Sequence, residues 1–114
     1  MQEGYYSIEY VGAYGRGRAL LALNHGKITG VDVGDVKYQG MYSYNPRTDL
    51  IDFELTLTVP PGTQLVPDGR IRARKEVIVI KESMPRDGTD TPLPINTPIG
   101  PVNVLLRRIS DLPE

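Results

Sequence analysis

The sequence predicts an all-β protein that folds as a small antiparallel β-barrel of roughly eight strands. In residues 1–44, aromatic and aliphatic side chains alternate with polar ones, which is the period of a β-strand. Glycines interrupt this alternation at short intervals, and glycine at such positions bends or ends a strand. No segment has apolar residues at helical spacing over the length of a helix. These observations favour short strands that curl around a common interior.

The first three predicted strands are joined by tight turns. Residues 4–12 form the first strand, and residues 18–23 form a second one that is apolar on both faces. The Asn-His-Gly-Lys sequence at 24–27 predicts a hairpin, because Asn and Gly tolerate the positive φ of tight turns. A third strand follows over 27–33. Gly30 interrupts it and predicts a bulge or a sharp bend.

The next two predicted strands flank a proline-containing turn. Residues 38–44 form the fourth strand, with tyrosines in phase on one face. Pro46 presets φ in the following turn. Residues 50–59 then alternate aliphatic or aromatic side chains with Asp, Glu and Thr. This strand is expected to have one buried face and one face in solvent.

The remaining sequence predicts further strands around a proline-rich stretch. Residues 70–74 and 76–81 are strand-like, and residues 101–109 form a last strand that pairs back to close the barrel. Between them, residues 85–101 contain many prolines. Proline has no N–H to donate to a strand ladder, so this stretch is expected to be a loop or an extended arm along a sheet edge.

The composition indicates a single domain over residues 1–114. The absence of cysteine excludes disulfides and thiolate sites. A net charge of −1 gives no long-range field to attract nucleic acid or an anionic membrane. No apolar run reaches the roughly 20 residues of a membrane-spanning helix. The chain starts without the basic and apolar regions of a secretory signal, so a cytoplasmic location is expected.

Tyrosine dominates the aromatic residues, with seven Tyr against one Phe and no Trp. Tyr6, Tyr10, Tyr38 and Tyr42 fall on strand positions that can face a common interior. Buried phenol hydroxyls need hydrogen-bond partners, which suits a ligand cavity with a polar rim. The competing interpretation is that these rings pack the barrel and their hydroxyls reach its ends.

Few residues form a pattern that is typical of catalysis or metal binding. His25 is the only histidine, and a common metal site needs several ligands around it. Asp32 and Asp35 flank a glycine, as Asp does in turns where it caps its own backbone. Asp52 alternates with apolar neighbours, so it is expected to face solvent. The sequence therefore predicts no catalytic residue, no metal and no cofactor.

One basic segment offers a weak signal for nucleic-acid binding. Arg70, Arg72 and Arg74 are in phase on the predicted strand, and Lys75 follows them. Such a row can contact phosphates while tyrosines stack on bases. A solvated basic edge strand that prevents edge-to-edge aggregation is the commoner use of this pattern. Nucleic acid is therefore not an expected partner.

The N-terminal residues resemble the GrlR-like family, named for a negative regulator of type III secretion genes. The resemblance rests on Gly4-Tyr-Tyr-Ser-Ile, on Gly15-x-Gly, on Gly26-x-Ile-x-Gly-x-Asp and on Tyr38-x-Gly. It implies a small bacterial β-barrel of lipocalin-like appearance that forms a homodimer and binds a transcriptional activator. In that family a run of acidic residues is associated with partner binding. Here the nearest substitutes are Asp32, Asp35, Asp49 and Asp52.

Two functions are expected from these observations. The first is a non-catalytic regulatory protein that acts through protein–protein interaction by sequestering a transcriptional regulator, with the four aspartates as its partner-binding surface. The alternative is a barrel that binds a small ligand in an interior lined by tyrosines. Neither reading makes the chain an enzyme.

Overall fold

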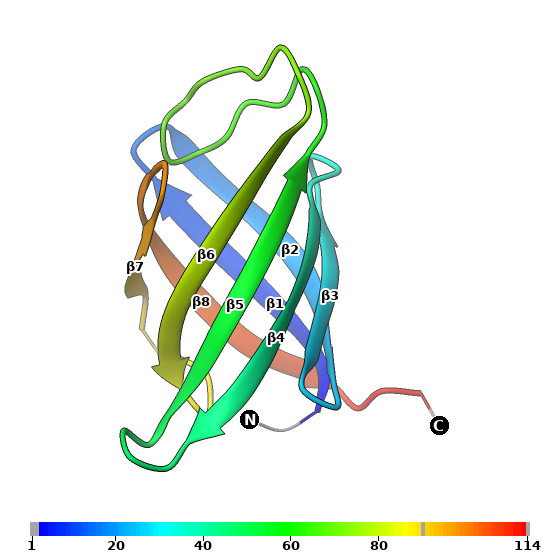
Figure 1. Cartoon of the computed structure of the whole chain (residues 1–114), viewed down its shortest axis with the longest axis vertical. Coiled ribbons are helices and arrows are strands. Elements are labelled where there is room, and N and C mark those ends of the chain that lie inside the picture. Colours follow the sequence, from blue (N-terminus) through cyan, green and yellow to red (C-terminus); the bar gives the residue numbers. More distant parts are fainter. Residues whose placement is uncertain (1–2, 90, 114) are drawn as a thin grey trace.

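The structure is a computed structural model that describes residues 3–89 and 91–113, and it confirms the all-β prediction (Figure 1). Eight antiparallel strands form one sheet in the order β6-β5-β4-β3-β2-β1-β8-β7. The strands are β1 (Gly4–Gly12), β2 (Gly15–Asn24), β3 (Lys27–Asp32), β4 (Lys37–Asn45), β5 (Leu50–Val59), β6 (Glu76–Pro85), β7 (Leu93–Thr97) and β8 (Gly100–Ser110). Among the described residues, no helix is long and apolar enough to cross a membrane.

The strands wrap into a nearly closed barrel. β1 to β6 follow one another as an up-and-down meander, and β8 returns to pair along β1. β7 then pairs only with β8, so β6 and β7 are the two edge strands of the sheet. They contact each other along one side of the barrel without forming a ladder. We call this line of contact the seam.

Alternating side chains fill the barrel interior. Tyr6, Leu21, Tyr38, Ile51 and Leu55 are buried members of the main core, which draws on the strands from β1 to β6 and on β8. A smaller cluster under the seam consists of Ile95, Val102 and Val104. This inward alternation is the pattern that predicted the strands from the sequence.

The predicted strand bounds agree closely with the structure for most elements. The ranges 4–12 and 50–59 coincide with β1 and β5. The proline-rich segment contains β7, a short edge strand, as expected for an arm along a sheet edge. The predicted bulge at Gly30 is wrong, because the register of β3 with both neighbours runs through it without a shift.

The prediction of a strand over 70–74 is also wrong. Residues 60–75 form a loop across one end of the barrel, with only a single bridge between Gln64 and Ile71 (Figure 1). Arg72 does not share an exposed face with Arg70 and Arg74, because it turns inward and is buried.

Buried Arg72 fastens this loop to the start of β6. Its guanidinium donates to both carboxylate oxygens of Asp68 at 2.7 Å and to Glu76 Oε2 at 3.1 Å. It also donates to the carbonyl of Arg70 at 2.7 Å. This geometry uses the planar fork that only arginine provides. The loop therefore covers the barrel end with an ion-pair network where a basic strand was expected.

Candidate functional site

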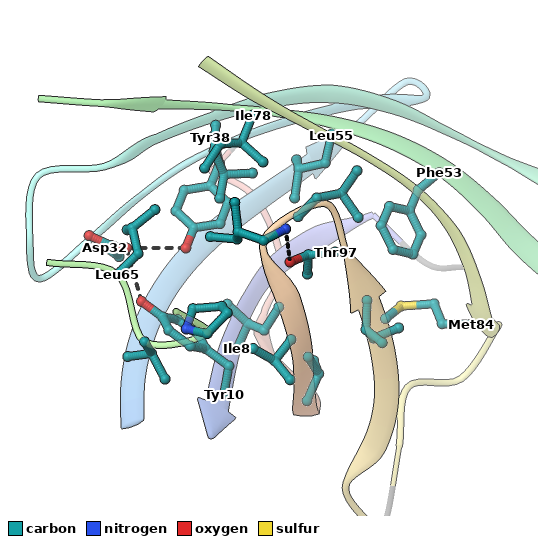
Figure 2. A pocket seen from close by; sticks show the side chains of 18 residues that line it. Ile8, Tyr10, Asp32, Tyr38, Phe53, Leu55, Leu65, Ile78, Met84 and Thr97 are labelled. Atoms are coloured by element: carbon teal, nitrogen blue, oxygen red, sulfur yellow. Dashed lines mark hydrogen bonds between the residues drawn. The ribbon is translucent and has the colours of Figure 1, made fainter. Parts of the chain in front are cut away.

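A cavity of about 100 Å³ lies inside the barrel under the loop and the seam (Figure 2). Its walls come from β1, β3 to β8 and the loop residues Leu65, Val66 and Pro67. All of its lining residues are aliphatic, Phe, Pro or Met, apart from Tyr10, Asp32, Tyr38 and Thr97. The cavity thus has a long apolar wall and a small polar end.

Asp32 forms the centre of the polar end. It is the last residue of β3, and the turn that follows it bends back onto its carboxylate. Oδ1 accepts hydrogen bonds from the backbone N–H of Gly34 at 2.8 Å and of Val36 at 3.1 Å. This is the self-capping turn that an aspartate prefers. Here the turn holds a charged side chain inside the barrel, where it is only 9% exposed.

The second carboxylate oxygen of Asp32 is shared by two tyrosines. Tyr10 Oη donates to Oδ2 at 3.0 Å, and Tyr38 Oη donates to the same atom at 3.1 Å. Burial, followed by the charge of Asp32, raises the pKa of Tyr10 to about 12. Burial also raises the pKa of Tyr38, with further contributions from Tyr10 and Asp32. Both phenols are therefore protonated donors at neutral pH.

Gly17 makes room for one of these tyrosines. It lies opposite Tyr10 in the β1–β2 ladder, and a β-carbon at this position would overlap with the Tyr10 ring. The strand predicted over 18–23 excludes Gly17, whereas β2 includes it, and the Tyr10 ring occupies the space left by its missing side chain. No pattern in the sequence pairs these two residues.

The fourth polar residue of the lining, Thr97, also uses its hydroxyl within the protein. Its Oγ1 donates to the carbonyl of Gly100 at 2.6 Å and accepts from the N–H of Ile99 at 3.2 Å. These bonds close the β7–β8 turn. The Thr97 hydroxyl therefore has little hydrogen-bonding capacity left for a ligand in the cavity.

The structure places two of the four candidate tyrosines on the cavity. Tyr10 and Tyr38 line it, whereas Tyr6 is buried in the main core outside the lining. Tyr42 is half-buried, packs against that core and lines a surface groove between β4, β5 and β6. Strand alternation identified the interior tyrosines but could not separate those on the cavity from those in the packed core.

The four candidate aspartates do not form one surface. Asp32 points into the barrel, and Asp35 is exposed in the β3–β4 turn. Asp49 is exposed in the β4–β5 turn, at the opposite end of β4, where it accepts from Tyr44 Oη at 2.7 Å. Asp52 is half-buried on β5 and accepts from Ser83 Oγ at 2.6 Å, one of the bonds that lower its pKa. Partner binding by the exposed members stays a prediction.

Among residues 3–89 and 91–113, no group of three or more His, Asp or Glu side chains is placed to hold a metal ion. His25 is exposed in the β2–β3 turn, where its backbone N–H donates to Glu3 Oε2 at 2.6 Å. Of the features described above, the cavity alone combines a buried lining, a charged side chain and unfilled volume.

Comparison with known proteins gave no match to a protein-family model, to a curated protein or to a solved structure. The resemblance to the GrlR-like family therefore rests on the quoted N-terminal residues alone.

Proposed function

We propose that this protein binds a small, largely apolar molecule inside its barrel. The observation that carries the proposal is the cavity itself, whose apolar wall ends at the Asp32 carboxylate and the two phenols that donate to it. Apolar lining with a few fixed polar groups is the usual construction of a small-molecule site. Eight-stranded barrels are also of a size that can hold one modest ligand.

The energetics are compatible with reversible binding. Filling an apolar cavity of this volume recovers on the order of 2 kcal/mol of packing free energy, taking about 24 cal/mol per Å³. A hydrogen bond to a charged group adds about 1.5–3 kcal/mol. The sum is expected to give affinities near the millimolar range for a minimal ligand, and a longer molecule that reaches out of the cavity would bind more tightly.

The regulatory function suggested by the GrlR-like resemblance stays a separate prediction. It needs a protein partner, and Asp32, one of the four residues of its proposed surface, is buried in the barrel interior. Homodimerisation and a cytoplasmic location are likewise expectations from the sequence. For this reason the ligand-binding function is the conclusion we draw.

Native mass spectrometry of the gently purified full chain tests the proposal. A bound small molecule that is released on denaturation is the expected result, together with a rise in melting temperature when it is added back. Two variants at neighbouring positions on β6 localise the site. Ile80→Trp fills the cavity wall, whereas Val79→Trp adds the same bulk outside it, since Val79 is exposed and absent from the lining. Binding is expected to be lost only in Ile80→Trp, and equal binding by the two variants would contradict the proposal.

A further inference from the structure

The polar end of the cavity has a specific chemistry that narrows the ligand class, if the proposed function holds. We infer that the ligand carries a hydrogen-bond donor as its polar group, with a protonated amine preferred, and that carboxylates are rejected. The inference rests on two observations: the hydrogen bonds that the hydroxyl protons of Tyr10 and Tyr38 already make, and the negative charge of Asp32.

The hydroxyl protons of the lining are already used. Each phenol has one proton, and both Tyr10 and Tyr38 donate theirs to Asp32 Oδ2. The Thr97 hydroxyl donates to the carbonyl of Gly100. A phenol oxygen that donates its proton still has lone pairs to accept a bond. The side chains at the polar end therefore offer acceptors to a ligand and no free donor.

The charge at this end is negative. Four N–H or O–H donors point at the two oxygens of Asp32, which is the arrangement expected for an ionised carboxylate. Both partners of Oδ1 are backbone N–H groups, which can only donate, and a proton on Oδ2 would require one of the two phenols to give up its donated hydrogen bond and accept instead. None of the ion pairs among the described residues includes Asp32.

A buried carboxylate that lacks a cationic partner attracts a cationic ligand. Opposite charges interact more strongly in an apolar surrounding than in water, and a charge-assisted hydrogen bond is about twice as strong as a neutral one. A ligand carboxylate at the same place would meet like charge and find no donor. An alcohol can donate one uncharged hydrogen bond, so its affinity is expected to lie between those of the protonated amine and the carboxylate.

The volume of the cavity sets the size of the apolar group that fills it. A cavity of about 150 Å³ accommodates benzene, so the present cavity, at about 100 Å³, suits an apolar part of about four carbon atoms. Short n-alkyl compounds that differ only in their polar group are therefore matched probes. They also keep the apolar contact constant while the head group changes.

Calorimetric titration of the full chain with n-butylammonium, n-butanol and pentanoate at pH 7 tests the inference, with n-pentane as the head-free probe. We expect n-butylammonium to bind at least about tenfold more tightly than n-butanol, a difference of about 1.4 kcal/mol. Pentanoate is expected to show no binding. Pentanoate binding as tightly as n-butylammonium would overturn the inference and leave the proposed function standing. Absence of binding by all four probes would overturn both.

Two variants tie the preference to Asp32. Asp32→Asn keeps an oxygen for the Gly34 and Val36 N–H groups and removes the charge, so the preference for the ammonium over the alcohol is expected to fall to less than threefold. Tyr10→Phe removes one donor from the carboxylate and keeps the charge, so the preference is expected to persist. If Asp32→Asn does not fold, Tyr10→Phe still decides, because loss of the preference in that variant would overturn the inference.

Discussion

Tyr10 occupies the space that a side chain at Gly17 would fill, and this pairing across β1 and β2 directs the phenol hydroxyl to Asp32. The glycine is thus part of the polar end of the cavity although it has no side chain to line it. The relationship leads to a first prediction about stability.

Gly17→Ala is expected to displace the Tyr10 ring and lengthen its hydrogen bond to Asp32. Overpacking of this kind costs about 1–3 kcal/mol. The free energy of unfolding in urea measures the loss. Gly34→Ala is the matched control, because a β-carbon there would lie 3.4 Å from the nearest atom, Asp32 Oδ1, which is an ordinary van der Waals distance. An equal loss in the two variants would contradict the role given to Gly17.

Asp32→Ala removes the acceptor that two phenols and two backbone N–H groups share. A buried donor left without a partner costs about 1–3 kcal/mol, so a total loss of about 3 kcal/mol is expected even when water reaches some of the groups. Asp35→Asn serves as the exposed comparison from the same turn, because asparagine also tolerates the positive φ of Asp35, and it should change the unfolding free energy much less. A loss below about 1 kcal/mol for Asp32→Ala would show that its hydrogen bonds do not hold the interior together.

Arg72→Ala is expected to release the loop over the barrel end. The change leaves Asp68 and Glu76 without their buried partner, and breaking a buried ion pair costs about 3–5 kcal/mol. Asp68 retains some solvent contact, so the lower end of that range is expected. Hydrogen exchange should rise across residues 60–75. The control, Arg70→Ala, lies close in the sequence with a side chain that is 71% exposed, and it should cost less than about 1 kcal/mol.

The same network predicts a loss of stability in acid. Hydrogen bonds from Arg72 lower the pKa of Asp68 to about 2 from its usual value of 3.8. Because the folded pKa is the lower one, the unfolded chain binds this proton first, and the contribution to stability is fully present only above pH 4. It is lost as the pH falls from about 4 to about 2. Urea unfolding over this range should therefore show a shallower pH slope for Asp68→Asn than for the unchanged chain.

Strand periodicity was sufficient to predict most of the fold. The alternation in residues 50–59 placed β5 between its observed bounds, because one face of that strand is buried or half-buried along its whole length. Strand periodicity gave the wrong result at Arg72. Charged residues in phase indicate a strand face in solvent, and the sequence does not show that Arg72 has buried ion-pair partners. Asp68 and Glu76 lie four residues away on either side, but only the folded loop brings them to one guanidinium.

The site was predicted in part. Tyr10 and Tyr38 were identified as interior residues by their phase along their strands. Asp32 was assigned to a partner-binding surface, as one of the nearest substitutes for the acidic run of the GrlR-like family. Its phase was the overlooked signal, since Ile28 and Asp32 share a face of β3 and both are buried. The Gly17 contact with Tyr10 joins two strands, so no local pattern contains it.

The seam gives the barrel wall one line that can part without disrupting the sheet. Ile80 of β6 and Ile95 of β7 line the cavity from the two sides of the seam, and these strands touch through side chains instead of ladder hydrogen bonds. Separating them exchanges side-chain contacts for solvent, whereas parting any paired neighbours would break a row of backbone hydrogen bonds. Opening along this line would therefore leave the backbone ladders between the paired strands intact.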